Sequence, residues 1–467
     1  MVNPRLLGAE LGTTPRSIRR WLSRQPEFSE SHVKHTRIVL AKDDPLLLRM
    51  KNHFAIQANL DLDGDAACEE FSATAEADLA ATMARAEDSH HFVELQLTRV
   101  IGPLALKLHT GRSRNEQIAT DMRLFVREAI DATVKGLRRW ALALIELAEQ
   151  AGDAVMPSYT HLQRAEPVLV AHWLLAYVSM IERDASRLAD ARQRMNLCPL
   201  GSGAVAGATL ALDRTIAARA LGFAGPTPNS MDATSDRDFL LEFTQALATL
   251  GVHISRFAEE LTLYATAEFG FLDLPEAFST GSSAMPQKKN PDFTELMRGK
   301  SARLVGAATT LAVLLKGLPL AYNKDLQEGQ EPVFDAADTV RGILGILPAF
   351  TRSLKFNFER MKSAATTGYL NAMAAATYLS NTGVPFRKAH EIIGNAVRLG
   401  LESGRELDAI PLAKLQELSP EFGEDFHAAI PLEATLDCHD VIGGTARTRV
   451  RAALAQARQR LSSDALA

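Results

Sequence analysis

Apolar residues recur at helical spacing in four long stretches of this chain. The stretches cover residues 116–151, 167–197, 236–268 and 293–315. Their period of about 3.6 residues predicts helices with one buried face each, whereas alternating β-branched runs are scarce. In the last stretch the apolar positions are Leu296, Met297, Leu304, Val305, Ala308, Leu311, Leu314 and Leu315. We therefore predict an all-α fold in which long helices lie side by side in a bundle.

The spacing of prolines and glycines predicts three domains. Residues 111–355 hold the long helical stretches and form the central domain. After about Phe358 the helical patterns shorten and prolines and glycines return, which predicts a small helical domain over residues 356–467. Residues 1–110 form an N-terminal domain, whose first eighty or so residues differ in character from the rest.

Composition mainly excludes classes of protein. The chain has 467 residues, of which 46% are hydrophobic and 23% are charged, and its net charge is −5. These values predict a soluble globular protein with an ample core. We expect no membrane span and no signal peptide, because the apolar stretches are short and the chain's start has no apolar run. Three scattered cysteines exclude a disulfide framework or zinc site and favour the cytoplasm.

The N-terminal segment contains two weaker patterns. Residues 1–25 carry five arginines against one acidic residue, and residues 7–22 loosely resemble a helix-turn-helix. So short a unit cannot bury a core alone and the remaining chain is not basic, so we do not expect nucleic-acid binding. Residues 61–65 imitate the start of a calcium loop, but Ala66 and Ser72 replace the glycine and glutamate that it needs. We expect no bound metal.

The stretch with the most chemistry is residues 281–292, which read GSSAMPQKKNPD. Asn290 suits an N-cap and Pro291 the first helical position, while Asp292 and Glu295 place negative charge in the first turn. The preceding loop therefore leads into a helix N-terminus, where free N–H groups and lysines favour an anion. The alternative is a solvated basic loop with an ordinary cap.

Two further polar turns also precede helical stretches. Residues 109–115 offer two guanidinium groups and an amide, a set suited to binding carboxylates. Residues 158–164 contain His161, and histidine is the side chain that most readily transfers protons near neutral pH. Taken alone, each turn has a purely structural explanation. The first could be an arginine-rich helix cap, and the histidine of the second could simply hydrogen-bond to neighbouring residues. Together they would form a multiply anchored site for a polyanionic substrate.

These segments carry a resemblance to a known family. The stretch 281–291 resembles the signature of the fumarase/aspartase superfamily, whose members release fumarate. From about Glu87 to the C-terminus the chain resembles argininosuccinate lyases in particular. The segments that carry this resemblance are 110–115, 159–163, 199–204, 235–238 and 318–325. It implies a homotetramer built on a central long-helix bundle, with each active site assembled from three subunits.

The resemblance also implies a reaction, the β-elimination of argininosuccinate to arginine and fumarate without metal or cofactor, as in arginine biosynthesis. By similarity Ser282 removes the Cβ proton, and Lys288 with backbone amides stabilises the doubly charged carboxylate that forms. His161, oriented by Glu295, then protonates or polarises the leaving guanidinium, although the reverse assignment of acid and base is also tenable. The substrate-binding positions carried over are Arg114, Asn115, Thr160, Lys288, Asn290, Tyr322 and Gln327.

The sequence departs from the family in a few places. Gln330 stands where the family has a lysine that grips a substrate carboxylate, and losing such a contact removes about 1.5–3 kcal/mol. Residues 1–80 lack the family's opening motif, while Glu116 and Glu166 are milder changes from aspartate and glutamine. Two alternatives therefore stand beside the first: a related lyase acting on another N-substituted aspartate, and a non-catalytic tetramer that retains the lyase fold.

Overall fold

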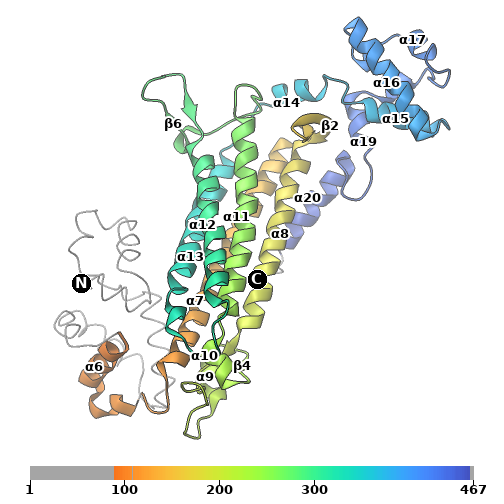
Figure 1. The fold of residues 1–467 in the computed structure, drawn as a ribbon. Coiled ribbons are helices and arrows are strands. Elements are labelled where there is room, and N and C mark those ends of the chain that lie inside the picture. Colours follow the sequence, from red (N-terminus) through yellow and green to blue (C-terminus); the bar gives the residue numbers. More distant parts are fainter. Residues whose placement is uncertain (1–88, 108, 463–467) are drawn as a thin grey trace. The chain divides into compact units, whose positions relative to one another are not determined.

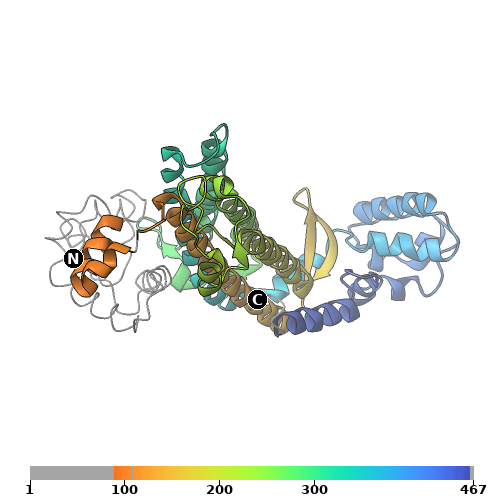
Figure 2. The ribbon, with the colours of Figure 1, turned by 90° about the horizontal axis from the view of Figure 1, so that it is seen from below.

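The computed structural model describes residues 89–107 and 109–462, and most of this length is helical (Figure 1). The long helices are α7 (Arg114–Ala151), α8 (Val170–Met195), α11 (Asp238–Tyr264), α12 (Asp292–Leu315) and α13 (Gln330–Arg352). They run side by side in both views (Figures 1 and 2). The all-α prediction is confirmed, and α7, α8, α11 and α12 coincide with the four predicted stretches to within a few residues. The patterns at residues 7–22 and 61–72 lie outside the described residues.

The chain separates into two compact units, and each of the five long helices contributes residues to both. Among the described residues, the first unit contains those up to 132 together with 187–251 and 302–340. The second unit contains residues 133–186, 252–301 and 341–462. These units interleave along the sequence, and the three consecutive domains stay a prediction.

Aromatic residues fill the core of the second unit where α7, α8 and α11 meet. Trp140 and Tyr177 both pack edge-on against Phe257, with ring centroids 5.5 Å and 4.9 Å away. The Trp173 Nε1–H and the Tyr177 hydroxyl donate to the same carboxylate oxygen of Glu260, at 2.6 Å and 2.5 Å. Burial and the nearby Glu260 charge raise the pKa of Tyr177, so its hydroxyl stays a donor. The polar network therefore ties α8 to α11 inside an otherwise apolar core.

Shorter helices complete the second unit. They are α14 (Phe358–Ala365), α15 (Ala372–Asn381), α16 (Phe386–Ser403), α17 (Leu412–Gln416), α18 (Phe426–Ala429), α19 (Leu432–Asp437) and α20 (Arg447–Ser462). Residues 375–430 form an apolar cluster of their own, in which Phe422 and Phe426 are fully buried. Helix α16 ends at Gly404, whose φ of 62° closes the helix in the left-handed conformation that glycine adopts freely. The return of glycines and prolines after Phe358 thus marks shorter helices, as predicted.

The first unit carries its own short elements. They are α6 (Ser89–Ile101), α9 (Arg214–Ala220), α10 (Ser230–Ser235) and the 3₁₀ turns η1 (Gly102–Lys107) and η3 (Lys324–Gln327). Strand β3 (Leu197–Cys198) pairs in parallel with β4 (Gly225–Pro226). In the second unit β5 (Leu272–Asp273) pairs antiparallel with β8 (Lys355–Phe356).

A β-hairpin replaces the predicted start of the second long helix. Strand β1 (Val155–Thr160) pairs antiparallel with β2 (Gln163–Leu169), and Pro167 lies opposite Pro157 in this pair. The prediction that Pro167 opens a helix is therefore wrong, because α8 begins only at Val170. Proline fixes φ near the values of both a helix start and an edge strand, so its presence alone does not separate the two.

Helix α12 buries one side and leaves an uncharged stripe on the other. Met297, Leu304 and Leu311 are buried as predicted, but Leu296 and Val305 are exposed. We define the α12 stripe as the exposed residues Leu296, Gly299, Ala302, Val305, Gly306, Thr309, Ala312 and Val313. These uncharged positions recur in steps of three residues, with two adjacent pairs, and give a surface along the helix of the kind that a second helix covers closely.

In the described part of the chain, no helix is long and apolar enough to cross a membrane. Among these residues, no cluster of three or more His, Cys, Asp or Glu side chains is placed to hold a metal ion.

Candidate active site

The first element of the candidate site is an arm, residues 280–290, which projects before α12. Its two short strands, β6 (Thr280–Gly281) and β7 (Lys289–Asn290), pair antiparallel. Asp292, the first residue of α12, accepts hydrogen bonds from the Thr280 N–H at 2.8 Å and its hydroxyl at 2.6 Å. These bonds lower the pKa of the Asp292 carboxyl and fix the base of the arm to the helix.

Ser282 organises the loop of the arm. Its N–H donates to the Lys288 carbonyl at 3.1 Å, and its Oγ accepts from the N–H groups of Ala284 at 3.2 Å and Met285 at 3.0 Å. Lys288 Nζ donates to the Asn290 side-chain oxygen at 2.8 Å. Asn290 therefore lies in β7 and does not cap α12 as predicted. The arm brings together Ser282, Lys288 and Asn290, three of the candidate residues.

The hairpin β1–β2 carries the next two candidates, Thr160 and His161. Its two turn residues, His161 and Leu162, have φ values of 56° and 57°. Two successive positive φ values between paired strands define a type I′ turn, which usually contains asparagine or glycine. His161 makes no hydrogen bond with any described residue, and both turn residues are exposed. The turn thus presents the imidazole outward.

Packing under the hairpin holds this turn in place. The Tyr159 ring contacts Phe269 and Phe271, with centroids 5.4 Å and 6.4 Å away. The Ser158 hydroxyl donates to the Glu166 carbonyl at 2.7 Å and accepts from its N–H at 3.1 Å, across the irregular register of the two strands. The residues directly before the turn are therefore fixed by both aromatic packing and hydrogen bonds.

The arm and the hairpin lie at the same end of the second unit but on opposite sides of α11 (Figure 1). No described hydrogen bond joins them. Glu295 lies 3.7 Å from Arg298 in an exposed pair and does not contact His161. Within one chain, the predicted orientation of His161 by Glu295 is therefore not observed.

The remaining candidates lie in the first unit, where Arg114 and Asn115 open α7. Ser113 precedes the helix, and its Oγ accepts from the Asn115 N–H at 3.2 Å. Glu116 reaches back to the Ser113 N–H at 3.2 Å, which completes a capping box. Its other oxygen accepts from the Gly203 N–H at 2.6 Å. Glu116 is only 1% exposed, and this burial raises its pKa.

The Glu116 carboxylate therefore links the start of α7 to the segment around Gly203. We expect its removal to lower the stability of the protein. In a Glu116→Ala variant the Gly203 N–H is left buried without a partner and the helix loses half of its capping box. We expect the free energy of unfolding to fall by about 2–3 kcal/mol, measured by urea denaturation. Ser113→Ala is the matched control, because it removes only the cap and should cost about 1 kcal/mol. Equal losses in the two variants would contradict the bridging role of Glu116.

Tyr322 and Gln327 lie in the connection between α12 and α13. Ala321 has a φ of 72°, and the Asn323 amide bridges the Pro319 and Ala321 carbonyls at 3.0 Å and 3.2 Å, which fixes the turn around Tyr322. Gln327 ends η3. Gln330, which replaces the family's lysine, is the first residue of α13 and is buried.

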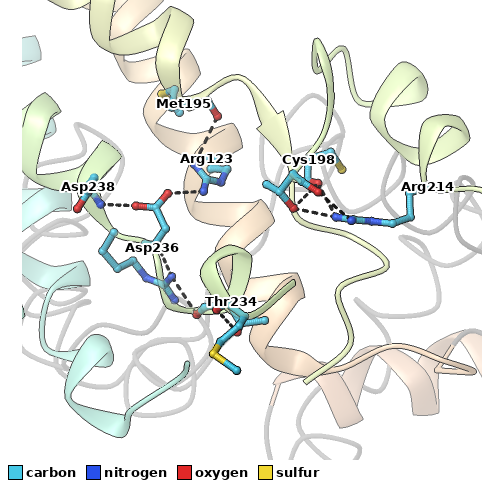
Figure 3. Close-up of polar contacts among 10 residues, drawn as sticks. Arg123, Met195, Cys198, Arg214, Thr234, Asp236 and Asp238 are labelled. Atoms are coloured by element: carbon cyan, nitrogen blue, oxygen red, sulfur yellow. Dashed lines mark hydrogen bonds and ion pairs between the residues drawn. The ribbon is translucent and has the colours of Figure 1, made fainter. Parts of the chain in front are cut away.

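Two buried arginines of the first unit are functional candidates that the sequence did not single out (Figure 3). Arg123 Nη2 forms an ion pair with Asp236 at 2.5 Å, and its guanidinium lies 4.4 Å from the centroid of the Phe239 ring. Arg237 follows Asp236 directly and is also buried. The segment 235–238 carried family resemblance, but only the structure shows that these side chains are buried together.

The fold is that of a helical lyase. A family model described as Lyase matches residues 27–306, and one for the argininosuccinate lyase C-terminal region matches residues 369–437. The structure of an EDDS lyase variant with bound fumarate superposes with a TM-score of 0.77 at 25% identity, covering 90% of this chain and 86% of that one. The fold is shared with 3-carboxy-cis,cis-muconate lactonizing enzyme from Pseudomonas putida, with a TM-score of 0.70 at 21% identity over 89% of this chain and 95% of that one.

Curated relatives narrow this class. Argininosuccinate lyase from Acidobacterium capsulatum is 66% identical over 379 residues, 81% of this chain and 78% of the relative. The enzyme from Koribacter versatilis is 59% identical over 375 residues, 80% of this chain and 81% of the relative. The chain therefore belongs to the argininosuccinate lyase family and is a carbon–nitrogen lyase. The lyase match begins at residue 27, about sixty residues before the segment in which the motifs first showed the resemblance.

Proposed function

We propose that this chain cleaves argininosuccinate to arginine and fumarate, with Ser282 as the base and His161 as the acid. Ser282 takes a proton from the substrate Cβ, and the electron pair left on carbon forms the double bond of fumarate. The C–N bond breaks as this bond forms. The nitrogen that leaves with arginine takes a proton from His161, so charges and protons balance.

The observation that carries this proposal is the environment of Ser282 Oγ. A serine hydroxyl is a weak base unless its deprotonated form is stabilised. The N–H groups of Ala284 and Met285 both donate to Oγ, and hydrogen bonds to an oxyanion favour its charged form. Lys288 lies on the same arm and supplies a positive charge for the substrate carboxylate that gains charge as the proton leaves.

His161 suits the acid because the type I′ turn presents it away from its own hairpin. Its lack of a hydrogen bond to any described residue leaves both ring nitrogens open to substrate. We propose that seven side chains bind the substrate and that Glu295 supports His161 from another chain. The seven are Arg114, Asn115, Thr160, Lys288, Asn290, Tyr322 and Gln327.

Gln330 supports a second substrate class. A buried neutral glutamine at the start of α13 lacks the charge with which a lysine would grip a carboxylate. An N-substituted aspartate whose substituent has no carboxylate facing position 330 would not need a lysine there. Such a substrate would be cleaved as readily as argininosuccinate. Fumarate release followed by ultraviolet absorbance, measured with argininosuccinate and with such a substrate, distinguishes the two substrate classes by their kcat/KM.

We further propose that the enzyme is a homotetramer with each site shared between chains. The α12 stripe supplies an uncharged surface that a second copy of this helix would cover. The separation of hairpin and arm in one chain also favours sites that take His161 and Ser282 from different copies. Light scattering on the purified protein should give four times the mass of one chain.

Release of fumarate from argininosuccinate, followed by its ultraviolet absorbance, tests the reaction, and mixed assemblies test the sharing. Chains carrying Ser282→Ala and chains carrying His161→Asn should each be nearly inactive alone. Tetramers that contain both kinds of chain can be isolated with two different tags. In them about a quarter of the sites should combine an intact Ser282 with an intact His161 by random assortment, and these sites should be active. Mixed tetramers without recovered activity would show that both residues of a site come from one chain.

We propose the cytoplasm as the compartment. Cys198 and Cys438 are both free thiols, which suits a reducing environment.

A further inference from the structure

Arg237 has a donor that no described residue of the chain occupies. The residue connects α10 to α11 and is 4% exposed. Its Nη1 donates to the Asp236 carbonyl at 2.7 Å and, more weakly, to the Thr234 carbonyl at 3.5 Å. Its Nη2 is buried and has no hydrogen-bond partner among the residues that the structure describes. Buried guanidinium groups are normally paired with anions or fully hydrogen-bonded, so this nitrogen indicates a partner that binds from outside the chain.

The adjacent Asp236 carboxylate is paired with Arg123 and not with Arg237 (Figure 3). Its Oδ2 accepts from Arg123 Nη2 at 2.5 Å, and its Oδ1 accepts from the Asp238 N–H at 2.7 Å, at the start of α11. The Asp236 carboxylate thus forms its ion pair with Arg123, whereas the Asp236 backbone carbonyl accepts from Arg237. One positive charge remains without a direct ion pair, and a carboxylate from a ligand would neutralise it.

Tyr322, a candidate substrate-binding residue, is one of the groups that affect the pKa of Arg237. The charged and titratable groups that act on it are Asp236, Arg123 and Tyr322. Burial lowers the pKa of Arg237 to about 10, so the guanidinium remains charged at neutral pH despite the desolvation. Tyr322 belongs to the turn that leads to η3 and α13, and α13 begins with the neutral Gln330. The first unit thus has a buried cation near Tyr322 and no cation at position 330.

We propose that Arg237 Nη2 binds a carboxylate of the substrate beside Tyr322, as a specificity-determining contact of this lyase. The proposal rests on the proposed function, since argininosuccinate and its products all carry carboxylates. It gives this chain a substrate contact that does not depend on a lysine at position 330. Because Nη2 carries two N–H groups, it can donate to both oxygens of one carboxylate or to the carboxylate and a second acceptor.

The test compares Arg237→Gln with a matched arginine in the same unit. Arg214 is half-buried, and its donors already bind carbonyls within the chain: Nε binds Leu200 at 2.8 Å and Nη1 binds Thr227 at 2.9 Å. Nη2 of Arg214 also donates to the Cys198 carbonyl at 3.2 Å. Arg214→Gln should therefore lower stability while leaving the KM for argininosuccinate unchanged.

For Arg237→Gln in the assembled enzyme we expect KM to rise about 10- to 100-fold, with kcat within a few-fold of wild type. Inhibition constants for added fumarate and added arginine, measured separately, should show which product loses affinity and thus which carboxylate is bound. Arg237→Lys keeps the charge but not the fork, and it should recover part of the lost affinity. It also replaces the glutamine variant if that one does not fold.

Calorimetric titration of argininosuccinate into Ser282→Ala, with and without Arg237→Gln, gives a readout that does not need turnover. Weaker binding only in the double variant supports the contact. Unchanged binding, together with a stability loss like that of Arg214→Gln, overturns it and leaves Nη2 with a buried water. A wild-type enzyme that releases no fumarate would instead contradict the proposed function.

Discussion

Replacing Ser282 by alanine is expected to lower kcat for fumarate release by about 10²- to 10⁴-fold, the usual contribution of a positioned base. The variant loses the oxygen that we propose takes the Cβ proton, whereas the proposed substrate-binding residues Lys288 and Asn290 remain on the arm. KM should therefore change much less than kcat. Fumarate absorbance at saturating argininosuccinate measures the loss.

The neighbouring hydroxyl provides the control for this experiment. Ser283 is exposed and makes none of the hydrogen bonds that organise the arm, so Ser283→Ala should keep wild-type kcat. Because the arm is exposed, neither variant should change the free energy of unfolding by more than about 0.5 kcal/mol. Equal activity of the Ser282→Ala and Ser283→Ala enzymes would exclude Ser282 as the base.

Replacing His161 by asparagine should lower kcat by about 10²- to 10⁴-fold, because asparagine neither donates nor takes up a proton at neutral pH. Asparagine is chosen because it tolerates positive φ, so the type I′ turn should persist. Steady-state kinetics at saturating substrate, with circular dichroism to verify folding, gives the comparison.

Leu162→Asn is the matched control for the turn. Leu162 has nearly the same φ as His161, is 69% exposed and carries no group that transfers protons. This variant should retain kcat within a few-fold. If both asparagine variants lose activity to the same degree, turn geometry and not proton transfer explains the effect of His161.

The sequence predicted the long helices well because their apolar periodicity extends over many turns. Helix α12 was expected from residue 293 and begins at Asp292. The starts of shorter features were less predictable. Pro167 has a φ compatible with a helix start, and only its pairing with Pro157 shows that it belongs to a strand.

The hairpin had no sequence signal that could have identified it. Type I′ turns are recognised by asparagine and glycine, and this turn has His161 and Leu162 instead. His161, the proposed acid, stands where asparagine or glycine is usual, which removes the local evidence for the turn. The exposure of Leu296 and Val305 was unpredictable for another reason, since periodicity gives the apolar face of a helix but not whether its own chain covers it.

The site was predictable as separate motifs and not as an arrangement. Ser282, Lys288 and Asn290 share one arm because they are close in sequence, and Thr160 and His161 share one hairpin for the same reason. The ion pair between Arg123 and Asp236, which leaves Arg237 without this carboxylate as its partner, joins residues more than a hundred positions apart. Pairings at that distance are set by tertiary packing.

The type I′ turn limits how far this fold can be stabilised without loss of chemistry. Non-glycine residues held at positive φ cost of the order of 1–3 kcal/mol each. An engineer seeking thermal tolerance would exchange the pair for asparagine and glycine, and would thereby delete the proposed acid. Leu162 can be changed freely for this purpose and His161 cannot. Natural substitutions that raise the thermal stability of the enzyme should therefore occur at Leu162 and not at His161.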